Sequence, residues 1–368
     1  MSGSYLYWGY ATFLLLLSLL YTFLTFFYSK SFIKVAFFRS FSFIYIILVI
    51  LCLMLWGIDD NTYLTYLIVP LFSYNYFKLT TFLDFKEKWL DITAVISLWS
   101  IISFSLFIFD IFDPQTIMMG DHKFDLLFGI NIRASESRLC GVSFEPGVFQ
   151  ILLIYTLLMW VKNIRFWYFT NLTKIKLLIC VVALLTTQST MGYLGLIVVF
   201  GAIVASGGYV KRHFQKVIVL FMLFLPLTYI IYTSSIVQDK LNESDGNESY
   251  SIRIIDTMAS WRMIEDSPIL GNGIGKRWAN IAESYGNITN SNGVLNMISR
   301  LGVFWIVFYS YYAIKSCRKN RYDIIPIYYV LAVLIPLLNE DIAYTPLAFI
   351  FVSEFKKYPR NKLIQNVQ

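Results

Sequence analysis

The sequence has few charged residues and few side chains that bind transition metals. Only 14% of its 368 residues are Asp, Glu, Lys or Arg, which is below the range of soluble globular domains. Histidine occurs twice, at His122 and His213, and neither lies in a cluster with cysteines at the spacing of a metal site. We therefore expect no transition-metal site and no cofactor.

The sequence also lacks the features of a signal peptide and of an internal repeat. Residues 1–10 contain no Lys or Arg, and no small-residue cleavage site follows the first apolar run. No repeat suggests the inverted halves that are common in secondary transporters. We therefore expect the first apolar run to be a membrane span and not a cleaved signal peptide.

Long apolar runs dominate the chain instead. Hydrophobic residues make up 57% of it, and runs of the length that crosses the hydrocarbon core recur throughout. The sequence predicts an all-α polytopic membrane protein, with residues 1–368 as a single membrane domain. The predicted spans are 5–28, 41–58, 62–77, 91–112, 144–161, 175–188, 191–207, 217–235, 292–314, 323–339 and 342–355.

The distribution of cations predicts which side of the membrane each loop faces. If the N-terminus is outside, the alternate loops on the cytoplasmic side hold most of the 30 Lys and Arg residues. Most acidic residues then lie outside, including Glu340 and Asp341. Cys140 is the one cysteine of four that faces outward, so no disulfide is expected. The basic pI is then explained by anionic headgroups and not by nucleic acid.

Two long segments are predicted on the outer side. Residues 113–143 form one loop, and residues 236–291 form the longest loop of the chain. Within the second, Ile252–Asp266 has the pattern of a short amphipathic helix. Its predicted apolar face consists of Ile252, Ile255, Met258, Ala259 and Met263.

The first candidate site residues are Arg138 and Glu145. Glu145-Pro146 has the character of a helix start, where the positive end of the helix favours a carboxylate. Arg138 precedes it by seven residues across a Gly hinge. One interpretation is a capping acid with a topology-setting Arg. The other is an Arg held by Glu145 so that its planar fork binds a phosphate.

A second group of candidates lies between Arg262 and Arg300. Arg262 is followed by a turn with Gly271, Gly273 and Gly275, whose backbone N–H groups can cradle anionic oxygens, although such a sequence is more often only a loop. Ser291, Asn292 and Arg300 make the next helix unusually polar near its outer end. These side chains either join helices to one another or line a cavity.

The order of these motifs resembles that of the Wzy-type O-antigen and capsular polysaccharide polymerases, which are related to the O-antigen ligases. The resemblance is carried by Arg138-x6-Glu145-Pro146-Gly147, by Arg262, by Ser267-Pro268-Ile269-Leu270-Gly271-x-Gly273-x-Gly275, and by Asn290-Ser291-Asn292-Gly293 before Arg300-Leu301-Gly302. It implies a metal-independent glycosyltransferase at the outer face of the bacterial inner membrane. Donor and acceptor would be undecaprenyl-diphosphate-linked oligosaccharides, with a separate chain-length regulator as a further partner.

The resemblance assigns Arg138 and Arg262 to the donor diphosphate and Glu145 to the acid beside the first arginine. Many relatives place a His where this chain has Asn290-Ser291-Asn292, so the general base stays open between Glu145, His122 and an unidentified acid. Glu145 is favoured as an orienting residue. Direct displacement would invert the anomeric carbon. The alternatives are an O-antigen ligase and a flippase for lipid-linked oligosaccharides, although several spans lack the mid-helix charges typical of transport paths.

Overall fold

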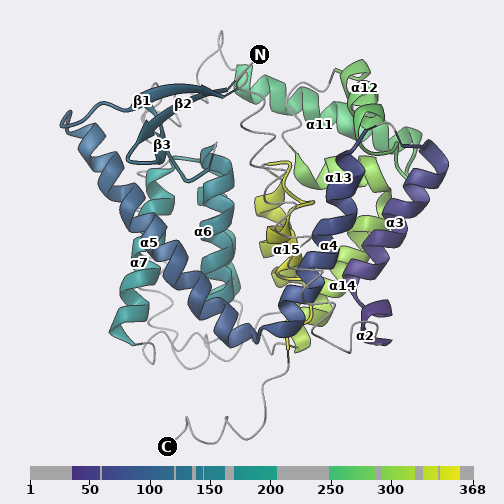
Figure 1. Cartoon of the computed structure of the whole chain (residues 1–368), viewed down its shortest axis with the longest axis horizontal. Coiled ribbons are helices and arrows are strands. Elements are labelled where there is room, and N and C mark those ends of the chain that lie inside the picture. Colours follow the sequence, from purple (N-terminus) through teal and green to yellow (C-terminus); the bar gives the residue numbers. More distant parts are fainter. Residues whose placement is uncertain are drawn as a thin grey trace, which may run out of the picture.

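The computed structural model describes a mostly helical protein (Figure 1). The described residues are 35–58, 60–119, 122–134, 138–143, 145–161, 170–204, 248–286, 292–319, 326–338 and 340–356. The predicted spans 5–28 and 217–235 lie outside them. Within the described part, one helix, Phe82–Ile108, is long and apolar enough to cross a membrane by itself. The number of predicted spans therefore stays a prediction.

The first described helices follow the apolar runs closely. They are α2 (Val35–Phe38), α3 (Phe41–Trp56), α4 (Thr62–Leu79) and α5 (Phe82–Ile108). Ser40 begins α3 and Thr81 begins α5, because each hydroxyl accepts a hydrogen bond from a backbone N–H in the first turn. This cap places the start of α5 nine residues before the predicted start of the span at 91.

The segment predicted as an outer loop at 113–143 contains a four-stranded antiparallel sheet, so the chain is mostly helical and not all-α. The strands are β1 (Gln115–Met119), β2 (His122–Leu127), β3 (Ile130–Arg133) and β4 (Arg138–Gly141), in the order β1-β2-β3-β4. Phe128 and Gly129 form the β2–β3 turn with positive φ values of 52° and 80°, as a tight hairpin requires. The sheet packs on α5 and α6.

The chain after the sheet supplies α6 (Pro146–Val161), α7 (Asn171–Thr186), α8 (Thr190–Val204), α11 (Glu248–Asp266) and α12 (Lys276–Ser284). These are followed by α13 (Gly293–Leu301), α14 (Val303–Lys319), α15 (Pro326–Leu337) and α16 (Pro346–Phe349). The predicted span 292–314 is therefore two helices. Gly302, with φ of 79°, separates them and packs against the carbonyl of Ile269 so closely that a side chain would overlap it.

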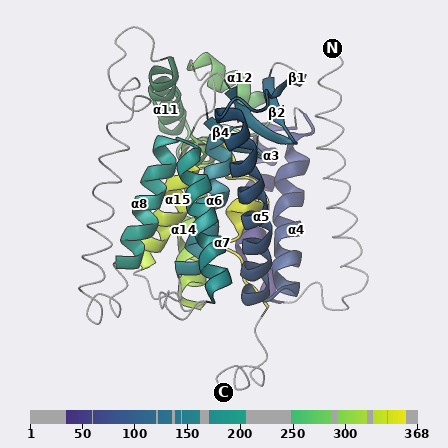
Figure 2. The same cartoon turned by 90° about the vertical axis from the view of Figure 1, so that its left-hand side faces the viewer.

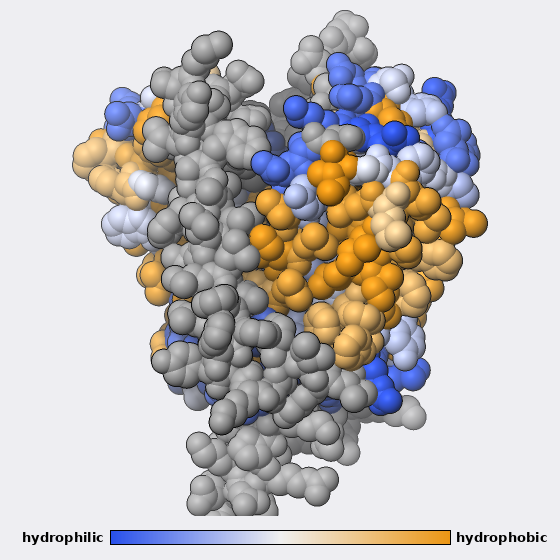
Figure 3. Space-filling model, turned by 45° about the vertical axis from the view of Figure 1, so that its right-hand side comes forward, coloured by the Kyte–Doolittle hydropathy of each residue, from blue (hydrophilic) through white to orange (hydrophobic). Residues whose placement is uncertain are grey.

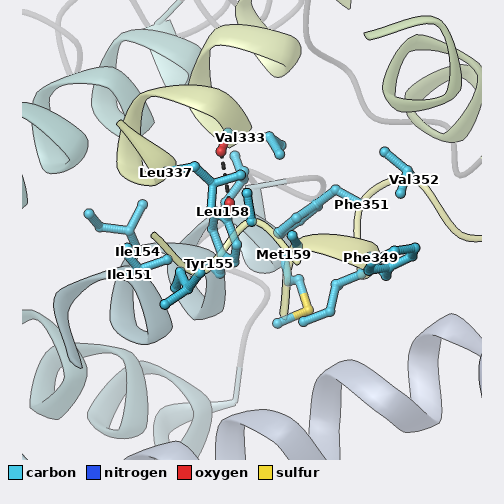
Figure 4. Close-up of a cluster of buried hydrophobic side chains, with 14 of the residues drawn as sticks. Ile151, Ile154, Tyr155, Leu158, Met159, Val333, Leu337, Phe349, Phe351 and Val352 are labelled. Carbon is cyan, nitrogen blue, oxygen red and sulfur yellow. Dashed lines mark hydrogen bonds between the residues drawn. The ribbon is translucent and has the colours of Figure 1, made fainter. Parts of the chain in front are cut away.

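The predicted helix 342–355 is wrong. Only the four residues of α16 are helical, and the chain then continues without regular structure to Lys356, which pairs with Thr81. Phe349, Phe351 and Val352 are each 1% exposed and belong to the main apolar core (Figure 4). Phe351 packs on Tyr155 of α6 and Tyr329 of α15, and Phe349 packs on α3. Irregular backbone can lie in an apolar environment when protein surrounds it, and the helices surround this segment.

The two ends of the bundle differ in chemistry. The sheet, α11 and α12 lie at one end, which we call the sheet end (Figures 1 and 2). At the other end, Lys78, Lys315 and Lys319 contact Glu354 at 3.2, 3.0 and 2.8 Å. Figure 3 shows apolar surface between polar surface at both ends. α5 likewise carries exposed apolar side chains, among them Ile92, Val95, Leu98 and Ile102.

Candidate functional site

Two arginines lie side by side on the sheet. The register of β3 and β4 places Arg133 directly opposite Arg138, so both side chains leave the same face of the hairpin. Both are half-buried, and Nε of Arg138 donates a hydrogen bond to the carbonyl of Thr187 at 3.3 Å. Two neighbouring guanidinium groups repel one another, so this pair favours an anion between them.

The turn after β4 brings Glu145 to the same place. Gly141 has φ of 65° and packs on the ring of Phe149, leaving no room for a side chain, so the strand end lies against the first turn of α6. The carbonyl of Glu145 accepts a hydrogen bond from Phe149 N, which confirms the predicted helix start at Glu145-Pro146. Glu145 therefore lies at the positive end of α6.

The charges of Arg133, Arg138 and Glu145 all act on the thiol of Cys140. Burial raises the pKa of Cys140 to about 12, although the positive charges of Arg133 and Arg138 act to lower it. The charge of Glu145 acts on the same thiol in the raising direction. Arg133, Arg138 and Glu145 therefore all lie near the Cys140 thiol at the sheet end.

Glu340, which the sequence marks only as an outward acid, completes this group. It follows α15, is 9% exposed, and forms a side-chain hydrogen bond with Glu145. Burial raises the pKa of Glu340 to about 9, and the charge of Glu145 and the hydrogen bond to it act in the same direction. Arg253 and Arg133 lower it in part, so both arginines lie near this carboxyl.

Arg253 is supplied by α11, which the sequence correctly predicts as a helix and whose buried face it predicts in part. Ala259 and Met263 of the predicted face are buried, whereas Ile255 and Met258 are exposed. Two polar residues, Asp256 and Ser260, are buried beside Ala259 and Met263, and Arg253 is half-buried.

Arg262 is not on the buried face of α11. It is exposed, and its charge acts on Tyr285 of the neighbouring segment after α12. Nine helical residues separate it from Arg253, which corresponds to about 14 Å along the axis and a half-turn difference in direction. Arg253 is therefore the arginine of α11 that the structure brings to Glu340.

The glycine turn after α11 binds the protein itself. Gly271, Gly273 and Gly275 all have positive φ, and a side chain at Gly271 would overlap the carbonyl of Arg300. The N–H groups of Asn272 and Gly273 donate to the carbonyls of Ser299 and Arg300, at 2.8 and 3.4 Å. These two N–H groups close the end of α13, and we call the turn the glycine clasp; its role in binding an anion stays a prediction.

The polar residues of α13 also have partners in the protein. Arg300 is buried, donates to both oxygens of Asp341 at 3.0 and 2.6 Å, and lies 3.9 Å from the ring centre of Trp278. Asn292 caps the helix by accepting from Leu295 N at 3.1 Å. The predicted substrate-binding role of these two side chains has no direct support from this geometry. Ser291 lies outside the described residues.

The site therefore consists of three arginines and two glutamates from five segments of the chain. We call it the Arg–Glu cluster. Sequence reasoning identified Arg138 and Glu145 from their position beside a Pro-Gly break, but missed Arg133, Arg253 and Glu340. A hairpin prediction over 130–141 would have paired Arg133 with Arg138. The polar residues of α11 near Arg253, Asp256 and Ser260, would have indicated a polar contact with the protein. The residues of the cluster are Arg133, Arg138, Glu145, Arg253 and Glu340.

Comparison with protein families confirms the resemblance noted from the sequence. The model of the O-antigen ligase family matches residues 175–310, so this region is similar to that family. Members of this family are membrane-integral, glycosyltransferase-like enzymes that act on lipid-linked oligosaccharides. Arg253 and the glycine clasp lie inside the matched region, and the remaining members of the Arg–Glu cluster lie outside it. Comparison with curated proteins and with solved structures gives no match.

Proposed function

We propose that the protein is a polymerase that joins polyisoprenyl-diphosphate-linked oligosaccharide units into O-antigen or capsular polysaccharide. The observation that carries this proposal is that Arg133 and Arg138 lie opposite each other on β3 and β4, and that Arg133 and Arg253 of α11 both act on Glu340 at the sheet end. A diphosphate leaving group needs its charge stabilised as the sugar–phosphate bond breaks, and preorganised arginines supply that stabilisation. Arg253 replaces Arg262 in the predicted set.

The location of the Arg–Glu cluster fits a donor anchored in the membrane. The cluster lies at the sheet end, above the apolar surface of the helices (Figures 1 and 3). A polyisoprenyl chain can stay in the bilayer while its diphosphate reaches the arginines. The lysines around Glu354 lie at the opposite end, which supports a multi-pass protein of the inner membrane with the sheet end facing outward.

The reaction follows from this placement. The hydroxyl of one lipid-linked unit attacks the anomeric carbon of a second unit, the bond from that carbon to the diphosphate oxygen breaks, and the diphosphate leaves with the electron pair. Attack from the side opposite the leaving group inverts the anomeric carbon. The chain contributes no covalent intermediate to this scheme, and its residues bind, orient and accept the proton.

An O-antigen ligase is the second candidate, and the family match itself favours it. A ligase would use the same donor site and transfer finished polysaccharide to another lipid. The donor chemistry of the Arg–Glu cluster is the same in both cases, so the acceptor has to be tested.

Reconstitution in liposomes separates these functions. Purified protein is supplied with one polyisoprenyl-diphosphate-linked unit and no other acceptor, and the products are resolved by length. A polymerase gives a ladder that Arg253→Ala abolishes. A ligase gives product only after a lipid A–core acceptor is added. Transfer of the unit across the bilayer without any extension would contradict both and would indicate a flippase.

A further inference from the structure

The contact between Glu145 and Glu340 has a chemical requirement. Two ionised carboxylates only accept hydrogen bonds and repel one another, so a hydrogen bond between them needs one shared proton. Glu340 is the more buried of the two, and burial disfavours its charged form. Glu145 lies at the positive end of α6, which favours its charge. The proton therefore belongs to Glu340, which donates to the Glu145 carboxylate.

The packing around Glu340 holds this arrangement in place. Gly293, at the start of α13, lies against the backbone carbonyl of Glu340 so closely that a side chain there would overlap it. The neighbouring Asp341 is bound by Arg300 and is therefore not available to the cluster. The charged groups that face Glu340 are Glu145 from α6, Arg253 from α11 and Arg133 from β3.

We propose that Glu145 is the group that takes the proton from the attacking sugar hydroxyl, and that Glu340 is a positioning residue that holds Glu145 through its own proton. This proposal rests on the proposed function.

The step balances as follows. The acceptor O–H bond breaks and its proton moves to the Glu145 carboxylate, while the oxygen bonds to the anomeric carbon and the diphosphate leaves. The proton passes to water when the diphosphate product leaves.

The shared proton can be tested without any substrate. The infrared spectrum of the purified protein at pH 7 should contain the C=O stretch of a protonated carboxylic acid, and Glu340→Gln should remove it. Asp125, a buried carboxylate that accepts from Thr116 Oγ1 at 2.8 Å, supplies the control as Asp125→Asn, which should leave the band in place. A spectrum in which Glu340→Gln removes no such band would overturn the shared proton.

The kinetic test separates the two glutamates. In the liposome reaction, Glu145→Gln should lower the single-turnover rate by about a hundredfold or more, which is the typical contribution of a general base, with donor binding within about twofold. Glu340→Gln should stay within about tenfold at pH 7, because its amide can still donate to Glu145. We expect the wild-type rate to change near pH 9, where Glu340 titrates, and the rate of Glu340→Gln not to change there.

Two results would contradict the proposal in different ways. If Glu340→Gln keeps the wild-type pH profile, or is as inactive as Glu145→Gln at every pH, Glu340 does not act by holding a proton on Glu145. If the wild-type protein transfers no sugar to any acceptor, the proposed function fails and the catalytic role fails with it. The infrared result then still reports whether the carboxyl pair exists.

Discussion

At the scale of single residues, α11 offers two arginines that share a helix but differ in surroundings. Arg253 is half-buried beside Glu340, whereas Arg262 is exposed on the opposite face. We expect Arg253→Lys to lower the transfer rate by about a hundredfold, because a lysine cannot reproduce the bidentate hydrogen bonds of a preorganised guanidinium.

The matched control is Arg262→Lys on the same helix. It should change the rate by no more than about twofold, since its side chain is about 14 Å further along the axis. Both rates are measured in liposomes with the same lipid-linked unit. A larger loss for Arg262→Lys than for Arg253→Lys would show that Arg262 binds the donor, as predicted from the sequence.

The buried Glu340 also makes the stability of the protein depend on pH. Its pKa is raised from 4.5 to about 9, so the folded protein binds this proton more tightly than the unfolded chain does. The stabilisation is present below pH 4.5 and is lost as the pH rises through about 9. We expect the melting temperature to fall over this window in the wild-type protein and to fall less in Glu340→Gln. Equal slopes for the two proteins would show that Glu340 does not retain its proton.

Local sequence identified only part of the Arg–Glu cluster, for a physical reason. Arg138 and Glu145 lie near a helix start that the local sequence Glu145-Pro146 predicts. Arg133, Arg253 and Glu340 acquire their role through strand register, helix rotation and the packing of a loop, and each of these depends on residues far away in the chain. The apolar pattern of α11 predicted its buried face only in part, because Ile255 and Met258 are exposed while Asp256 and Ser260 are buried.

At the scale of elements, the glycine clasp joins α11 to the break between α13 and α14. We expect Gly271→Ala to lower the free energy of unfolding by about 3 kcal/mol, because the new side chain would overlap the carbonyl of Arg300 in a backbone that already disfavours it. Gly129→Ala is the control. It has a similar φ of 80° but open space around it, and should cost about 1 kcal/mol. Thermal unfolding in detergent measures both, and equal losses would mean that the contact with Arg300 contributes nothing.

Hydropathy predicts the helices of this protein better than it predicts the segments between them. Runs such as 41–58 and 144–161 become α3 and α6, because a backbone in an apolar environment must satisfy its own hydrogen bonds. The same argument fails at 342–355, where surrounding helices bury an irregular segment. The sheet is missed because its strands are four to six residues long and only weakly alternating.

At the scale of the whole molecule, the two ends of the bundle should face opposite sides of the membrane. All four cysteines are buried among the residues described, so single cysteines introduced at exposed positions report their side against a low background. We expect Met118→Cys, in β1, to react with a membrane-impermeant maleimide in cells whose outer membrane has been made permeable. Lys356→Cys should react only after the inner membrane is opened as well.

The opposite labelling pattern would place the Arg–Glu cluster in the cytoplasm. Nucleotide-activated sugars are present there, so the argument for a lipid-linked donor would lose its basis. Labelling of both positions from one side would contradict the arrangement of the helices as membrane spans.

The irregular segment after α16 has a consequence for how the protein is made. It follows, in the chain, every helix that encloses it, including α3, α6 and α15. During synthesis those helices enter the bilayer first, with the centre of the bundle still unfilled, and the segment cannot enter ahead of them because it has no helical hydrogen bonds of its own. A ribosome that stalls before codon 356 therefore leaves a set of inserted helices with an open core, which is a form that membrane proteases can recognise and remove.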